Sequence, residues 1–246
     1  MHENVRVSGL LVDPNAFGGI VVVGLVLHVW TARTPLPVWP WRRRTAVSLV
    51  LLTALALTFT RSAWIALLSA LVVAFLLRGR VGVRPVRVSL PLAIGAALTV
   101  ALVSQPQVLS LALRPDQVIG RVDILRDATL EHQQSPIFGI GLESYILDHG
   151  LIVHNTPAWF LTEFGLLGLL VLGGFVTWYF RRLWRHSNDA SLPETRAIAF
   201  AVLLAQVAMV GLSVGIEAFY QRHWWLLLAA AGTLFAQSWL PEEHSS

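Results

Sequence analysis

The chain contains no cysteine and no lysine, and only 13% of its 246 residues are charged. The missing cysteines exclude disulfides, thiol nucleophiles and thiolate metal sites. A soluble domain of this size does not need so few charges, and several apolar runs are long enough to cross a hydrocarbon layer about 30 Å thick. With 55% hydrophobic residues and a mean hydropathy of +0.65, the composition predicts a polytopic helical membrane protein.

The apolar runs predict an all-α bundle of about seven transmembrane spans in one membrane domain, residues 1–246. The expected spans are 16–31, 45–60, 62–77, 89–104, 157–180, 197–215 and 223–240. The stretch 45–77 is too long for one ordinary span, and a hairpin with Arg61 at its tip would divide it into halves of roughly 24 Å. One continuous tilted helix is the alternative, but it would bury Arg61 near the middle of the membrane at a cost of roughly 3 kcal/mol or more.

Clusters of arginine in short connectors predict the orientation, because cytoplasmic loops are enriched in positive charge. The clusters are residues 42–44, 78–87 and 181–185, and all of them fall on one side of the alternating spans. That side is therefore expected to be cytoplasmic, which places Arg61, the long loop 105–156 and the turn 216–223 on the outer side. The same pattern accounts for the net charge of +4, so no nucleic-acid partner is expected.

The outer loop 105–156 is much longer than an ordinary connector. Within it, Val122, Leu125 and either Ala128 or Thr129 recur at helical spacing. This pattern predicts a weakly amphipathic helix that could lie on the membrane.

The end of the loop carries signals for a turn and for the start of a helix. The stretch "SPIFGIG", residues 135–141, ends the preceding helix and supplies Gly139 and Gly141 for close backbone approach. Glycine content alone is weak evidence for a phosphate cradle. Thr156 is expected to cap the next span, and Pro157 suits its first turn.

Ionisable residues on the outer side are the candidates for chemistry. His154 is the best suited to proton transfer, since an unperturbed imidazole exchanges a proton near neutral pH, although a lone interfacial histidine is more often structural. For Arg61, a functional role and a structural role, such as snorkelling or pairing with a carboxylate, have about equal weight. Glu163 lies inside an expected span and is a functional candidate, with an ion pair to Arg61 or Arg222 as the structural alternative.

No ligand set for a metal stands out. His149 and His154 are five residues apart rather than at the helical spacing of four, and the loops contain no paired aspartates of the kind that bind a metal diphosphate. If the protein binds a diphosphate, arginine must supply the positive charge through bidentate hydrogen bonds.

The chain resembles the O-antigen ligase and polymerase-like superfamily. The segments that carry the resemblance, in order, are "RVSGLLVDPNAFG", "TFTRSAW", "GRVDILRDATLEHQQSPIFGIGLESY", "HNTPAWFLTEFGLLGLL" and "YQRHWWLLLAAAGTL". The resemblance covers nearly the whole chain and implies a many-span membrane glycosyltransferase with a large outer loop between two late spans. Because members usually carry further spans before the first segment, the chain looks like the C-terminal part of such an enzyme.

The resemblance implies transfer of a glycan from a polyprenyl-diphosphate carrier to an acceptor hydroxyl, at the outer face of the bacterial inner membrane and without metal, ATP or other cofactor. His154 corresponds to the general base, and Arg61 and Arg121 correspond to arginines that bind the diphosphate and stabilise the charge developing on it. The less sharply marked positions are Arg222, expected to help bind the diphosphate, and Glu163, Asn155 and Arg126, expected to support the site.

Three other functions stay open on the sequence. A polysaccharide polymerase of the same superfamily would use similar chemistry on a carrier-linked acceptor. A transporter or exporter of lipid-linked glycan would carry broken helices and ionisable groups near the midplane, whereas the polar residues here gather on one face. A chain that acts only as an assembly partner is the third. The expected partners are a lipid-linked glycan donor, a glycan, lipid or protein acceptor, and membrane lipid.

Overall fold

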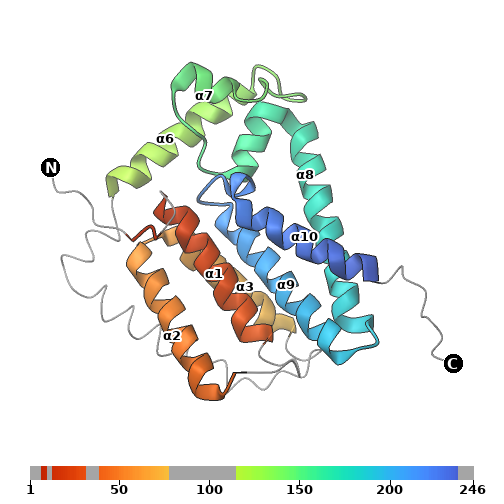
Figure 1. The fold of residues 1–246 in the computed structure, drawn as a ribbon. Helices are drawn as coiled ribbons and strands as arrows, with labels where there is room; N and C mark the ends of the chain where they lie inside the picture. Colours follow the sequence, from red (N-terminus) through yellow and green to blue (C-terminus); the bar gives the residue numbers. More distant parts are fainter. Residues whose placement is uncertain (1–6, 10–12, 32–38, 78–114, 238–246) are drawn as a thin grey trace.

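The structure, a computed structural model, describes residues 7–9, 13–31, 39–77 and 115–237. All regular elements in these ranges are helices, in agreement with the all-α expectation (Figure 1). In chain order they are α1 (Pro14–Thr31), α2 (Trp41–Thr58), α3 (Arg61–Leu77), α6 (Pro115–His132), α7 (Ser144–His149), α8 (Thr156–Asp189), α9 (Pro193–Leu212), the 3-10 helix η1 (Ala218–Tyr220) and α10 (Arg222–Gln237).

Three of the described helices, α1, α8 and α9, are long and apolar enough to cross a membrane, and α3 is apolar but shorter. The total of seven spans stays a prediction, since the expected span 89–104 lies outside the described residues.

Helices α2 and α3 meet at the turn that the sequence predicts. α2 ends at Thr58, Phe59 adopts a left-handed conformation with φ of 48°, and α3 begins at Arg61. The Thr58 hydroxyl accepts a hydrogen bond from the N–H of Thr60 (3.2 Å), which satisfies a backbone donor at this turn. Arg61 therefore lies at the end of a helix and not inside a continuous one.

Helix α9 is the centre of the bundle. It packs against α1, α3, α8 and α10, and residues 199–206 are all buried. The buried side of α3 consists largely of small residues, including Ala63, Ala66 and Ala70. Small residues let two helix backbones approach closely. Gly211 of α9 shows this, because a Cβ built there would come within 3.0 Å of the Ala66 Cα.

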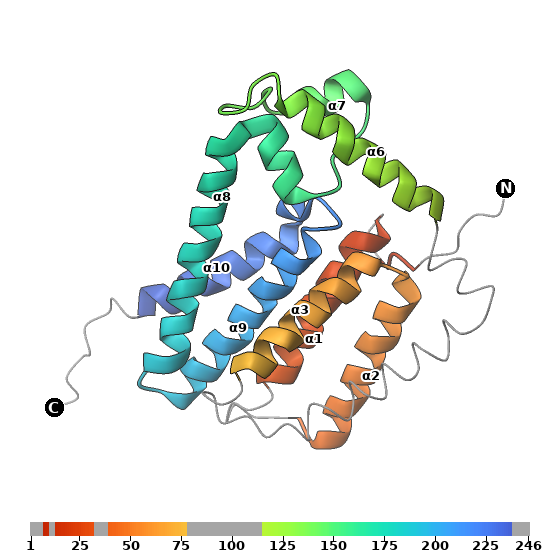
Figure 2. The ribbon, with the colours of Figure 1, turned by 180° about the vertical axis from the view of Figure 1, so that it is seen from behind.

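Helix α8 is broken at Gly165, and no local signal in the expected span 157–180 predicts the break. Gly165 has φ of 66° and ψ of −165°, a conformation that only glycine adopts readily. Figures 1 and 2 both show α8 as two arms that meet at a sharp bend. We call residues 156–164 the short arm and residues 166–189 the long arm.

Residues 135–141, which we call the clip, replace the helix hydrogen bonds that the break removes. Two N–H groups of the clip donate to the last carbonyls of the short arm, and two carbonyls of the clip accept from the first N–H groups of the long arm. The donor–acceptor pairs are Ile140–Thr162 and Gly141–Glu163 (both 3.0 Å), Leu166–Pro136 (2.9 Å) and Leu167–Ile137 (3.1 Å). The clip thus satisfies backbone groups that a broken helix would leave without partners.

Two glycines allow the clip to touch the bend. A Cβ on Gly139 would collide with the backbone of Glu163, and a Cβ on Gly165 would collide with the carbonyl of Ile137. The close backbone approach expected for "SPIFGIG" is therefore present, and the partner of the clip is the protein's own broken helix.

The amphipathic helix expected in the outer loop is α6, which packs against α8. Ala128 is buried in the contact with α8, whereas Val122 is 57% exposed, and contact of α6 with the membrane stays a prediction. Polar contacts hold α6 in its rotation. The Thr162 hydroxyl donates to the Ala128 carbonyl (3.2 Å), and the Arg121 guanidinium donates to the Gly215 carbonyl (3.0 Å).

Several helix ends meet at one end of the bundle. In both views the starts of α1, α3 and α10 lie near the ends of α2 and α9, and α6 crosses above them (Figures 1 and 2). The candidate residues on these ends are thereby brought together.

Replacing Gly165 by alanine should destabilise the protein far more than replacing Gly173. Alanine at Gly165 would be strained by about 1–3 kcal/mol before any collision with Ile137 is counted, whereas a Cβ at Gly173 meets nothing within 4 Å. We expect Gly165→Ala to lower the Tm in detergent by several degrees relative to Gly173→Ala. Equal Tm values would contradict the role given to the clip.

Candidate functional site

Residues 154–156 are hydrogen-bonded to the turn 213–218, and we call this contact the seam. The buried Thr156 makes three of its hydrogen bonds. The partners are the Ser213 carbonyl for its N–H (2.9 Å), the Ile216 carbonyl for its hydroxyl hydrogen (3.0 Å) and the Ala218 N–H for its hydroxyl oxygen (2.9 Å). The seam joins the start of the short arm to the end of α9 and to η1.

Asn155 caps α8. Its side-chain oxygen accepts a hydrogen bond from the N–H of Ala158 (2.9 Å), and its side-chain N–H donates to the carbonyl of Val214 in the seam (3.0 Å). The expectation that Thr156 is the cap is therefore wrong, because the Thr156 hydroxyl is engaged in the seam. Pro157 lies in the first turn as expected.

The expected base, His154, forms a hydrogen-bonded pair with Glu217. Its Nδ1 lies 2.8 Å from Oε2 of Glu217. A carboxylate can only accept, so the proton of the neutral imidazole belongs on Nδ1 and Nε2 is left as an acceptor. The His154 side chain is 40% exposed and that of Glu217 is 15% exposed. An accessible imidazole oriented by a largely buried carboxylate is the arrangement that a general base requires.

The environment of Glu217 keeps its carboxyl group ionised. Burial by itself would raise the pKa of Glu217, but the hydrogen bond from His154, a backbone hydrogen bond and the nearby charge of Arg121 lower the pKa below the usual 4.5. At neutral pH the resulting carboxylate can stabilise an imidazolium at His154.

Arg121, on α6, lies near Glu217 and His154. The pKa of Arg121 is lowered, first by burial and next by the positive charge of Arg61, while Glu217 and Asp13 act in the opposite direction. Arg61 and Arg121 are thus close enough to repel each other. Arg61, Arg121, His154 and Glu217 come from four separate parts of the chain, and we call them the charged cluster.

The described parts of the first two segments of the family resemblance are hydrogen-bonded to each other beside this cluster. The Thr60 hydroxyl donates to the carbonyl of Pro14 (3.1 Å), which joins the start of α3 to the start of α1. Asp13 in turn caps α1 by accepting from the N–H of Asn15 (2.9 Å). These contacts fix the backbone that carries Arg61 and Asp13.

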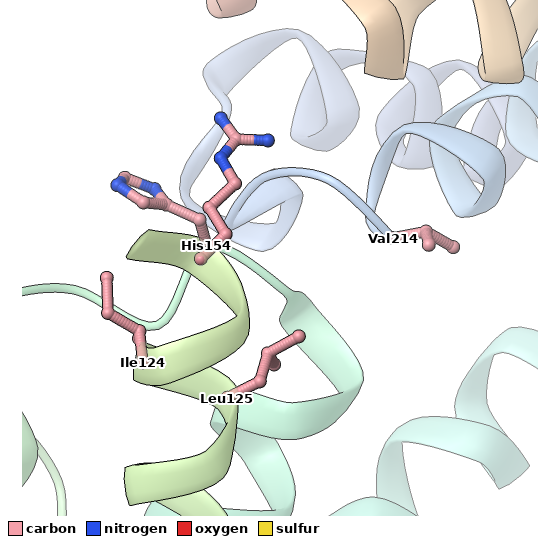
Figure 3. Close-up of a pocket in the computed structure, with 5 residues that line it drawn as sticks. Ile124, Leu125, His154 and Val214 are labelled. Atoms are coloured by element: carbon pink, nitrogen blue, oxygen red, sulfur yellow. The ribbon is translucent and has the colours of Figure 1, made fainter. Parts of the chain in front are cut away.

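A small pocket opens between α6 and the seam (Figure 3). It is lined by Arg121, Ile124, Leu125, His154 and Val214 and has a volume of about 50 Å³. Ordinary small-molecule sites start at roughly 300 Å³. The pocket is therefore large enough for a single chemical group and too small to enclose a whole small molecule.

The other expected residues lie outside this pocket. Arg126 and Arg222 are exposed, and Arg222 begins α10. Glu163 is only 3% exposed, and its carboxylate accepts a hydrogen bond from the N–H of Glu143, just before α7 (2.9 Å). Within the described ranges no ion pair of Glu163 with an arginine is found, so Glu163 supports the clip and α7. Within the described residues, no group of three or more histidine, aspartate and glutamate side chains is placed to hold a metal ion.

The family model described as O-antigen ligase matches residues 46–173, just over half of the chain. The chain belongs to the O-antigen ligase family. This membership makes it a membrane protein of the glycan-handling ligase and polymerase type. The matched region contains Arg61, Arg121 and His154, whereas Glu217 and Arg222 lie beyond it. No curated protein and no solved structure gives a significant match.

Glu217 is the residue that sequence reasoning missed in this O-antigen ligase family member. It stands 63 residues from His154, so no local spacing connects the two. The available signal was a carboxylate in the short turn 216–223, expected on the same side of the membrane as His154.

The stabilisation that comes from Glu217 should depend on pH. Because the pKa of Glu217 is lower in the folded protein, its ionisation stabilises the fold above about pH 4.5, and this contribution is lost as the pH falls through the lowered pKa. We expect Glu217→Gln to lower the Tm at pH 7, with an energetic cost of about 1 kcal/mol, and the difference from wild type to shrink toward pH 4. Glu194→Gln, which changes a partly exposed carboxylate in the first turn of α9, is the control. A difference that is constant between pH 7 and pH 4 would count against the ionised pair.

Proposed function

We propose that this O-antigen ligase family member transfers a glycan from a polyprenyl-diphosphate carrier to an acceptor hydroxyl at the outer face of the bacterial inner membrane. The observation that carries the proposal is the hydrogen bond between His154 and Glu217 at a pocket lined by Arg121. It combines an oriented base with a guanidinium suited to phosphate oxygens.

In the proposed reaction, Nε2 of His154 accepts the proton of the acceptor hydroxyl as the hydroxyl oxygen attacks the anomeric carbon of the donor glycan. The bond between that carbon and the diphosphate oxygen breaks, and its electron pair leaves with the polyprenyl diphosphate. Such a displacement inverts the configuration at the anomeric carbon. The carboxylate of Glu217 stabilises the imidazolium that forms on His154.

Arg61 and Arg121 serve the leaving group. One N–H group of Arg121 is held by the Gly215 carbonyl, which fixes the guanidinium and leaves other N–H groups for phosphate oxygens. The mutual repulsion of the two arginines would be relieved by a bound dianion, and this favours a diphosphate over a neutral ligand. Two guanidinium groups supply the positive charge, so the proposed step needs neither a metal nor another cofactor.

A transporter is less well supported. The broken helix α8 is a feature that transporters share. Among the described residues, however, the four that form the charged cluster meet at one end of the bundle: they are Arg61, Arg121, His154 and Glu217. The same site would serve a ligase or a polymerase, because the two differ in the acceptor.

The variants His154→Ala and Arg61→Ala should each lose glycan transfer. Removal of a general base typically costs a factor of about 100 or more, and removal of a charge that stabilises the leaving group costs a similar factor. The measurement is transfer from a polyprenyl-diphosphate glycan by purified protein in lipid. Product analysis shows whether the glycan lengthens, as in a polymerase, or moves to a new acceptor.

Arg185→Ala is the matched control, because Arg185 is exposed on α8 near its far end. Both site variants must keep the wild-type Tm and elution volume for the comparison to hold. Full transfer by a folded His154→Ala or Arg61→Ala protein would overturn the role proposed for that residue.

A further inference from the structure

Exposed apolar side chains gather where the clip meets the bend of α8. We call this group the apolar tip. Its members are Ile137, Phe138, Leu142, Leu166, Leu167 and Leu170, with exposed fractions between 50% and 72%. The two stretches that carry them, 135–142 and 164–170, contain no charged residue. An exposed apolar patch of this kind marks a surface that something covers.

The length of the long arm indicates what covers the tip. The apolar part of this arm runs from Leu166 to Phe180, before the exposed Arg181, and at 1.5 Å per residue this stretch is roughly 22 Å long. The guanidinium of Arg182 lies over the rings of Trp178 and Phe235, 5.3 and 4.8 Å from their centroids, which suits an arginine near the membrane interface. The hydrocarbon layer is about 30 Å thick. The apolar part of the arm is shorter than this layer, so the bend does not extend beyond the outer limit of the hydrocarbon.

The helices that end at the seam are also shorter than the hydrocarbon layer. The apolar part of α9, from Ala197 to Leu212, and helix α3, from Arg61 to Leu77, each span roughly 24–26 Å, and any tilt reduces this further. They reach less far than the hydrocarbon layer, so acyl chains extend beyond the seam, on the side where the tip stands.

We propose that the apolar tip inserts into the outer leaflet of the membrane. Backbone groups in lipid must find partners within the protein, and the four hydrogen bonds between the clip and the bend provide such partners. The tip also continues the exposed apolar surface of the long arm, where Val171 is 65% exposed. Of the two carboxylates beside the tip, Glu163 is buried and hydrogen-bonded, whereas Glu143, which follows Leu142, is exposed and marks the edge of the inserted surface.

Insertion of the tip sets the depth of the site. The short arm leads from the bend to the seam over roughly 13 Å, so the seam lies inward of the tip, within the outer leaflet. The diphosphate of a lipid carrier could then reach Arg61 and Arg121 without drawing its acyl chain out of the bilayer. This last step rests on the proposed function, whereas insertion of the tip does not.

The absence of cysteine allows a direct test with single labels. Phe138→Cys, and Leu142→Cys as a second tip variant, are coupled to an environment-sensitive nitrobenzoxadiazole fluorophore in nanodiscs of phosphatidylethanolamine and phosphatidylglycerol. Val171→Cys serves as the lipid reference, and Ser191→Cys, in the exposed connector between α8 and α9, serves as the water reference.

We expect both tip labels to emit at shorter wavelength than the Ser191 label, to be quenched by nitroxide-labelled lipid as strongly as the Val171 label, and to lose most quenching by iodide. Quenching by iodide equal to that of the Ser191 label would overturn the proposal. Protection from both quenchers would also overturn it, because protein would then cover the tip. The experiment includes no transfer assay. A negative result would therefore overturn insertion of the tip without bearing on the proposed function.

Discussion

The hydrogen bonds between residues 154–156 and the turn 213–218 hold together the parts of the chain on which the site depends. They fix the start of the short arm against the end of α9, and they bring Glu217 to within 2.8 Å of His154. They also present the Gly215 carbonyl that holds Arg121. The polar run His154–Asn155–Thr156 at the entrance of an apolar helix is explained by this contact, since each of the three side chains bonds across it.

The broken helix places that contact. If α8 were continuous, Thr156 would lie beyond the bend and away from α9. The break at Gly165 turns the short arm back, and the clip satisfies the backbone groups that the turn exposes. Strain and close approach are concentrated at two glycines, while the apolar residues around them form the tip. One local feature therefore shapes both the site and the proposed contact with lipid.

The sequence predicts features that depend on neighbouring residues. It does not predict features that depend on a partner distant in the chain. Arg61 between two apolar half-runs predicts a turn, because the cost of burying it is high. In the sequence, Gly165 cannot be told from other glycines in apolar runs. It is required because any side chain there would collide with the carbonyl of Ile137, which is distant in the sequence. The rotation of α6 depends on the bonds of Arg121 and Ala128 to distant elements, which the sequence of α6 does not reveal. Glu217 is the partner of His154 because α8 packs against α9, a contact that the sequence alone does not predict.

The protonation of His154 tests the central claim most directly. In protein labelled with ¹⁵N-histidine, the signal of His154 can be identified among those of the eight histidines by its loss in His154→Gln. For the neutral imidazole, the hydrogen bond to Glu217 predicts a protonated Nδ1 and an unprotonated Nε2, the nitrogen that would accept the proton of the acceptor hydroxyl. A spectrum with the proton on Nε2 would contradict the pairing and the role of His154 as a base.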